Sequence, residues 1–232
     1  MIVDKLRIGS IPAILWGEKS NKIIIAVHGS HSSKIDDCIW VLAEEATKYG
    51  YQVLSFDLPQ HGERIYETEP CMVQECVREL SDVLRFAQRQ VEHISVFGCS
   101  MGAYFSLLAY GNELIDRAWF LSPVIDMERI IHNIMDYCKI TEKEFEELQT
   151  IETPIENLYW DYYCFVKEHP IVSWKHPTHI LRGENDTLCE RELVADFANR
   201  FGCELVEQKG GEHWFHTPDD LAHFRSWLKD RL

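Results

Sequence analysis

Basic side chains are scarce in this 232-residue chain: 23 lysines and arginines stand against 38 aspartates and glutamates, a formal net charge of −15. We therefore expect no nucleic-acid partner, because phosphate binding needs a basic surface. Binding to an anionic membrane surface is disfavoured for the same reason. We interpret the acidity as favouring solubility.

The chain also lacks a long apolar run. No segment approaches the roughly 18 consecutive apolar residues of a membrane helix, so we expect no membrane span. The first ten residues contain Asp4 and no apolar core of signal-peptide length, so we expect no secretory leader. Hydrophobic residues nevertheless make up 46% of the sequence, enough for the core of one sizeable domain.

Closely spaced cysteine motifs are absent as well. The eight cysteines are scattered, and none forms a Cys-x-x-Cys pair. Cys71 and Cys76 are the closest two, but a metal site there lacks further ligands at useful spacing. We therefore expect reduced thiols in a cytoplasmic protein, and no metal.

Short apolar runs alternate with helical patterns along most of the chain. Strands are predicted at 3–8, 11–16, 23–27, 51–56, 94–97, 117–121, 178–182 and 204–208, and helices at 36–49, 72–90, 103–110, 190–201 and 219–232. In the first helix we place Trp40 on the apolar face with Ile39. Such alternation is typical of a mostly parallel sheet covered on both faces. We therefore predict an α/β fold with a mostly parallel eight-stranded sheet flanked by helices.

The alternation stops after the sixth strand. Residues 124–177 contain helical patterns only, at 127–137, 142–149 and 158–167. We therefore divide the chain into a core, residues 1–123 and 178–232, and an inserted segment, residues 124–177, which should lie over the carboxyl ends of the strands. We name His31, Trp160 and Tyr163 as candidate substrate-pocket residues, although an aromatic run at helical spacing more often serves packing.

A serine between two glycines follows the strand at 94–97. The sequence Gly98-Cys99-Ser100-Met101-Gly102 joins this strand to a small, apolar helix, which is the setting of a nucleophile elbow. A turn this tight strains its central residue and crowds any side chain at the glycines. It lifts the Ser100 hydroxyl above the helix N-terminus, and it directs the Met101 amide to where negative charge would develop.

Four further polar clusters fall at strand ends, where ligands bind in open α/β sheets. They are His28-Gly29-Ser30, the segment 57–62, Asp186, and His213 in the loop after the last strand. Serine needs a base to become a nucleophile, and histidine, with an ordinary pKa near ~6.5, is the natural one. A carboxylate then orients the imidazole.

Alternatives remain for both partners of the serine. Asp126 competes with Asp186 as the acid, and Asp186 could instead cap the following helix. His179, His216 and His223 compete with His213 as the base, and His179, inside a strand, reads as a packed core histidine.

Five motifs together resemble the α/β-hydrolase superfamily, close to its small carboxylesterase and monoacylglycerol-lipase-like members. They are HGS at 28–30, DLPQHG at 57–62, GCSMG at 98–102, GENDTL at 183–188 and GGEHWF at 210–215, and they span essentially the whole chain. The resemblance implies Ser100 as nucleophile, Asp186 as orienting acid and His213 as base. It also implies an oxyanion hole from the backbone amides of Ser30 and Met101, and a cap formed by the inserted segment.

The chain departs from the pattern of these relatives in two places. His31-Ser32-Ser33 stands where many have a glycine-rich stretch, and Gln60 and Arg64 replace a usual glycine and serine. We expect the segment around Asp57 to be structural, and His28 to bond the backbone near the oxyanion loop.

The activity that this resemblance implies is hydrolysis of a small carboxylic ester through an acyl-enzyme on Ser100, with no metal or organic cofactor. Thioester or amide hydrolysis, acyl transfer to an acceptor other than water, and ligand binding without turnover remain alternatives. The sequence identifies neither the substrate nor the oligomeric state, and a homodimer stays open.

Overall fold

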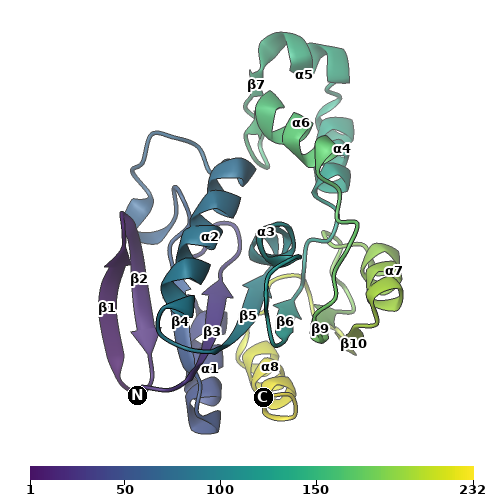
Figure 1. Ribbon diagram of the computed structural model, residues 1–232. Helices are drawn as coiled ribbons and strands as arrows, with labels where there is room; N and C mark the ends of the chain where they lie inside the picture. Colours follow the sequence, from purple (N-terminus) through teal and green to yellow (C-terminus); the bar gives the residue numbers. More distant parts are fainter.

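The alternating strands build one eight-stranded sheet in the computed structural model, which describes residues 1–232 (Figure 1). Its order is β1-β2-β4-β3-β5-β6-β9-β10. β1 and β2 form an antiparallel hairpin, β2 also pairs antiparallel with β4, and all other pairs of this sheet are parallel. The predicted fold class is thus confirmed. The strands are β1 (Val3–Ile8), β2 (Ile11–Trp16), β3 (Lys22–Val27), β4 (Gln52–Phe56), β5 (His93–Cys99), β6 (Ala118–Leu121), β9 (Thr178–Gly183) and β10 (Glu204–Gln208).

Helices cover both faces of this sheet. α1 (Asp37–Ala46) and α8 (Pro218–Lys229) pack against one face, and α2 (Val73–Gln88), α3 (Met101–Tyr110) and α7 (Arg191–Phe201) against the other. Alternate residues of β3 supply both cores: Ile23 and Ile25 point to the α2–α3 side, and Ile24 to the α1–α8 side. A strand buried on both faces needs apolar residues throughout, which explains the continuous run at this position.

Trp40 is a correction to the predicted apolar face of α1. It is 45% exposed and meets Trp16 edge-on, with ring centroids 5.5 Å apart, whereas Ile39 is fully buried. Neighbouring residues on a helix are turned by about 100°, so Trp40 reaches only the rim of the buried face. The helix continues into a short 3-10 turn, η1 (Thr47–Tyr49), and ends at Gly50 with a left-handed backbone, φ 77°.

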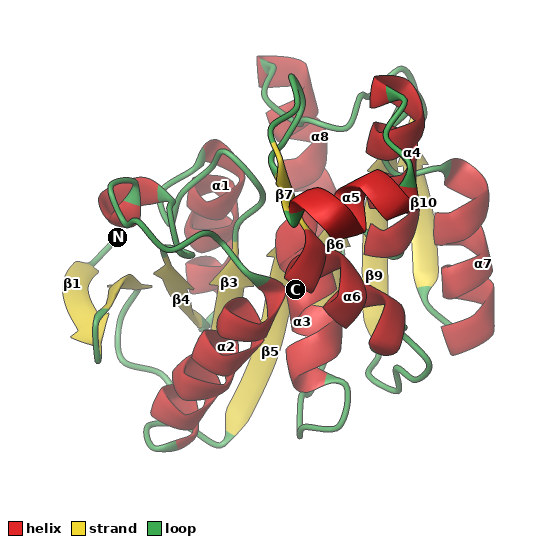
Figure 2. Cartoon of the chain, turned by 90° about the horizontal axis from the view of Figure 1, so that it is seen from above, coloured by secondary structure: helices red, strands yellow, loops and turns green.

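The inserted segment stands over the carboxyl ends of the strands (Figures 1 and 2). It holds α4 (Met127–Cys138), α5 (Glu142–Leu148) and α6 (Trp160–Glu168), and α6 packs on α2. The prediction of helical patterns only was wrong, because β7 (Thr150–Ile151) and β8 (Leu158–Tyr159) form a small antiparallel pair. Strands of two residues are too short to carry a readable period. No helix in the chain combines the length and hydrophobicity needed to cross a bilayer.

Candidate active site

Ser100 occupies a strained turn between β5 and α3. Its φ of 50° and ψ of −117° lie where side-chain-bearing residues are rare. A Cβ on Gly98 would stand 2.6 Å from the Cα of Ala103, and one on Gly102 would collide with the carbonyl oxygens at the end of β3. Both glycines are therefore required by close packing, and the strand–turn–helix form presents the serine above the sheet.

The structure brings Ser100, His213 and Asp186 into one hydrogen-bonded line. His213 Nε2 lies 2.9 Å from Ser100 Oγ, and His213 Nδ1 lies 2.9 Å from Asp186 Oδ2. The second carboxylate oxygen of Asp186 accepts backbone N–H bonds from Leu188 and Cys189, at 3.0 and 2.9 Å. The carboxylate is buried and fixed on both oxygens, so it holds the imidazole with Nδ1 protonated and Nε2 free to accept from serine.

Two neighbouring loops make this alignment possible. Asp186 follows β9 and His213 follows β10, and these strands pair in parallel, so their carboxyl ends adjoin. The Asn185 N–H donates to the Gly211 carbonyl at 2.7 Å, and a Cβ on Gly183 would lie 2.5 Å from the backbone of Gly211. The glycines let the two loops touch, which carries the imidazole back over the sheet to Asp186.

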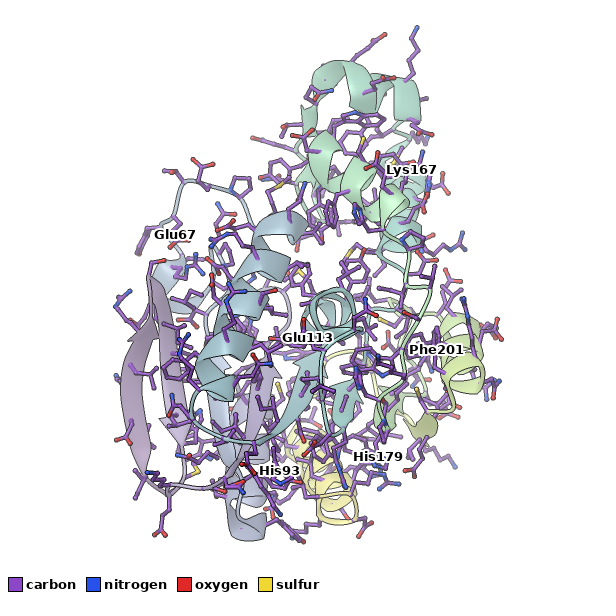
Figure 3. The ribbon with its side chains drawn as sticks, in the orientation of Figure 1. Glu67, His93, Glu113, Lys167, His179 and Phe201 are labelled. Atoms are coloured by element: carbon purple, nitrogen blue, oxygen red, sulfur yellow. The ribbon has the colours of Figure 1, made fainter.

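The competing residues lie elsewhere. Asp126 is exposed and caps α4 by accepting the Arg129 N–H at 2.9 Å. His216 is exposed and stacks on Trp214, and His223 is exposed on α8. His179 is not the core histidine that its strand position predicted, because its side chain is 25% exposed and pairs with Glu204 at 2.6 Å. Figure 3 shows it at the end of the sheet opposite to the inserted segment.

His28 fixes the loop that runs beside Ser100. Its Nε2 accepts the Leu58 N–H at 3.1 Å, so Nδ1 carries the proton and donates to the Gly29 carbonyl at 2.8 Å. Burial lowers the pKa of His28 to about 4, so this clamp is a neutral imidazole. The predicted backbone role of His28 is therefore seen. A Cβ on Gly29 would lie 3.2 Å from Ser100 Cβ, so the loop passes directly alongside the serine.

Comparison with known proteins points to one fold. No protein-family model matches the sequence, and no curated protein matches it. Among solved structures, Est1E from Butyrivibrio proteoclasticus superposes with a TM-score of 0.80 at 17% identity, over 98% of this chain and 96% of that chain. The chain has the α/β-hydrolase fold. Alpha/beta hydrolase domain-containing protein 10 from mouse gives 0.79 at 16% identity over 99% and 98%, and the Pyrococcus furiosus esterase PF2001 gives 0.70 at 21% over 99% and 89%.

Within this α/β-hydrolase fold, Asp57 organises the turn after β4. Its buried carboxylate accepts the backbone N–H groups of Lys34 and Glu63, each at 2.9 Å, and pairs with the Lys34 ammonium. A Cβ on Gly62 would overlap the same carboxylate. The segment is structural, as expected. Lys34 was not foreseen, since nothing in its local sequence distinguishes a buried lysine from a solvated one.

A cation could be considered beside the Ser100–His213–Asp186 line, because Cys189 lies close to it. One ligand atom each from Asp186, Cys189 and His213 falls within 4.8 Å of the others. Two of these groups already bond to each other, and the Cys189 thiol donates to the Ser122 carbonyl at 3.6 Å. The existing hydrogen bonds therefore account for all three side chains.

The three candidate pocket residues lie in different surroundings. Tyr163 is fully buried inside the inserted segment, packed against Phe145 and Trp160, so its side chain does not line a pocket. That prediction was wrong: the packing alternative holds for this residue. Trp160 is partly buried and lines a cleft of about 640 Å³ between the inserted segment and the loop at 59–72, which precedes α2. Ser100 is not among the residues that line this cleft.

His31 is 78% exposed and takes part in a bridge that the sequence did not reveal. Its Nε2 lies 2.7 Å from a carboxylate oxygen of Glu156, in the inserted segment. The same oxygen accepts from Ser30 Oγ at 3.1 Å. Glu156 thus joins the inserted segment to the loop beside Ser100.

Proposed function

We propose that the protein is a serine hydrolase that cleaves a small carboxylic ester through an acyl-enzyme on Ser100. The observation that carries this proposal is the line from Ser100 Oγ through His213 to the buried Asp186, set on an elbow with the required glycines. Each group has the neighbour that the chemistry needs, in the order that proton transfer needs it.

The reaction begins with attack of Ser100 Oγ on the ester carbonyl carbon. His213 Nε2 accepts the hydroxyl proton as the new C–O bond forms, and Asp186 stabilises the imidazolium. Collapse of the tetrahedral intermediate breaks the ester bond, and the proton on Nε2 passes to the leaving alcohol. Water, deprotonated by the same nitrogen, then releases the acid and restores Ser100.

The negative charge of the tetrahedral intermediate needs two donors. We assign them to the backbone amides of Met101, at the N-terminus of α3, and Ser30, in the loop that His28 fixes beside Ser100. Donors held rigidly before the reaction begins stabilise the developing charge without reorganisation. Removal of one such donor from a serine hydrolase raises the activation free energy by about 3–4 kcal/mol.

We further propose that the inserted segment is a cap that selects the substrate. It lies over the carboxyl ends of the strands, and Glu156 ties it to the Ser30–His31 loop. Trp160 lines the cleft between the segment and the loop at 59–72. Contacts at this place can discriminate the acyl or alcohol part without altering the three reacting side chains.

The proposal is tested by turnover of p-nitrophenyl esters of graded chain length, with a matching thioester and amide. A ferulate ester belongs in the panel, because a structure of Est1E holds ferulic acid. We expect ester turnover by the wild type, and loss of several orders of magnitude in a folded Ser100→Ala variant. Binding of these compounds without turnover would favour a ligand-binding protein, and faster thioester cleavage would favour a thioesterase.

A further inference from the structure

Two thiols lie together at the start of α2, outside the proposed catalytic line. Cys71 ends the loop before the helix and is partly exposed, and Cys76 is buried in the first turns of α2. Their sulfur atoms are 3.4 Å apart. The exposed loop that leads to them carries Glu67, labelled in Figure 3.

The surroundings give the two thiols different characters. A hydrogen bond from the Cys76 thiol lowers the pKa of Cys71 to about 6, and the His61 imidazole beside it acts in the same direction. Burial raises the pKa of Cys76 well above its ordinary range. Cys71 is thus the thiolate that an oxidant can reach, and Cys76 is a protonated thiol within contact of it.

We propose that Cys71 and Cys76 are a peroxide-reactive site, in which Cys71 is oxidised first and Cys76 resolves it to a disulfide. The oxidant class is hydrogen peroxide or a small organic hydroperoxide. This site is independent of the proposed hydrolase activity, since it uses neither Ser100 nor His213.

The chemistry balances in two steps. The Cys71 thiolate attacks one oxygen of hydrogen peroxide, so an S–O bond forms, the O–O bond breaks, and the released hydroxide takes up a proton as water. The Cys76 sulfur then attacks the sulfenic sulfur of Cys71. The S–S bond forms, the S–O bond breaks, and the hydroxyl leaves with the Cys76 proton as a second water. Two thiols are oxidised, and one peroxide is reduced to two waters.

Little movement is needed for the second step. The sulfur atoms must approach from 3.4 Å to a bonded distance of about 2.05 Å. Cys71 can supply this movement, because it lies in the loop just before the helix and Met72, the N-cap, makes no side-chain capping bond. By contrast Cys164, also partly exposed, has a raised pKa because burial disfavours its thiolate, and it has no thiol neighbour.

The test treats the folded wild-type protein with one equivalent of hydrogen peroxide and alkylates the remaining thiols before digestion. Trypsin releases Ile65–Arg78, which contains both cysteines. We expect this peptide to lose two hydrogens and to resist alkylation until it is reduced, while Cys164 stays alkylated. If both cysteines remain alkylated in the folded protein, or if Cys164 is oxidised as fast as Cys71, the proposal is overturned.

Two variants separate the roles of the thiols. In Cys76→Ser, whose hydroxyl can still donate to the Cys71 sulfur, the disulfide should be lost, and a sulfenic acid should accumulate on Cys71 and be trapped by dimedone faster than at Cys164. Cys38→Ser removes a buried thiol that contacts Cys99 and not this pair, and it should leave formation of the Cys71–Cys76 disulfide unchanged. Dimedone trapping at Cys71 that is no faster than at Cys164 would remove Cys71 as the reactive thiol.

Discussion

Replacing Asp186 by asparagine tests whether this carboxylate orients the His213 imidazole for the proposed reaction. The structure determines how the new amide must lie. Oδ1 of Asp186 accepts two backbone N–H bonds, from Leu188 and Cys189, so an oxygen has to stay in that position. The amide NH₂ of asparagine would therefore replace Oδ2 and face His213 Nδ1. Two donors cannot share that contact, and the imidazole is driven to the tautomer with Nε2 protonated.

The magnitude follows from this forced orientation. Flipping the amide would place its NH₂ group opposite two buried backbone N–H groups, at a cost in stability of about 1–3 kcal/mol for each unsatisfied group. The flipped orientation is therefore disfavoured. With Nε2 protonated, His213 cannot accept the Ser100 proton. The same change in a well-studied serine protease lowers kcat about 10⁴-fold, equivalent to about 5.5 kcal/mol, and we expect a loss of that order here.

The matched control is Asp126→Asn. Asp126 is exposed and serves as the N-cap of α4, a role that asparagine fills equally well. Its kcat for a p-nitrophenyl ester should stay within about twofold of the wild type, with unchanged thermal unfolding. A loss of less than tenfold in folded Asp186→Asn, or a larger loss in Asp126→Asn, would refute the assignment of the acid.

Three further tests concern the packing around the elbow, the proposed cap and the buried His28. Gly102→Ala should destabilise by more than about 3 kcal/mol in urea unfolding, because its Cβ meets backbone carbonyls, whereas Gly9→Ala, at φ 62° with open space around it, should cost only about 1–2 kcal/mol. Trp160→Ala should shift relative kcat/KM among ester chain lengths by about 1–3 kcal/mol, and Tyr163→Ala should instead lower stability by about 3–5 kcal/mol; equal effects of the two on selectivity would contradict their different burial. Burial lowers the pKa of His28 from 6.5 to about 4, so the unfolded chain takes up a proton first as the pH falls. The free energy of unfolding should therefore drop by about 3 kcal/mol from pH 6.5 to 4. If a His28→Gln variant shows the same slope over that pH range, His28 is not the source of the pH dependence.

Local patterns gave the sheet and the elbow from sequence. Gly98, Ser100 and Gly102 lie within five residues of one another, so the residue types and the periodicity of the flanking segments are sufficient to predict the turn. The hairpin across Gly9 and the buried run of β3 are local in the same way. Asp186 and His213 were placed by chain order and by the rule that strand ends gather functional side chains, and the adjoining loops after β9 and β10 provide the physical basis.

Features that depend on distant partners could not be predicted. Glu156 accepts a hydrogen bond from Ser30, 126 residues away in the sequence. The buried Lys34 ammonium is paired with the Asp57 carboxylate, which follows a different strand. Tyr163 shows the same limit, because helical spacing cannot tell which side of α6 faces the segment's own core and which faces the cleft. The cytoplasmic location stays a prediction from the sequence.

Covalent labelling of Ser100 tests the central claim most directly. The wild-type protein is incubated with a small fluorophosphonate, and the tryptic peptide 90–117, which contains Ser100, is sequenced by mass spectrometry. The account predicts one label per chain, on Ser100 Oγ, no label in a folded Ser100→Ala variant, and slowed labelling in Asp186→Asn. A folded wild-type protein that stays unlabelled, or a label on another residue that persists in Ser100→Ala, would contradict it.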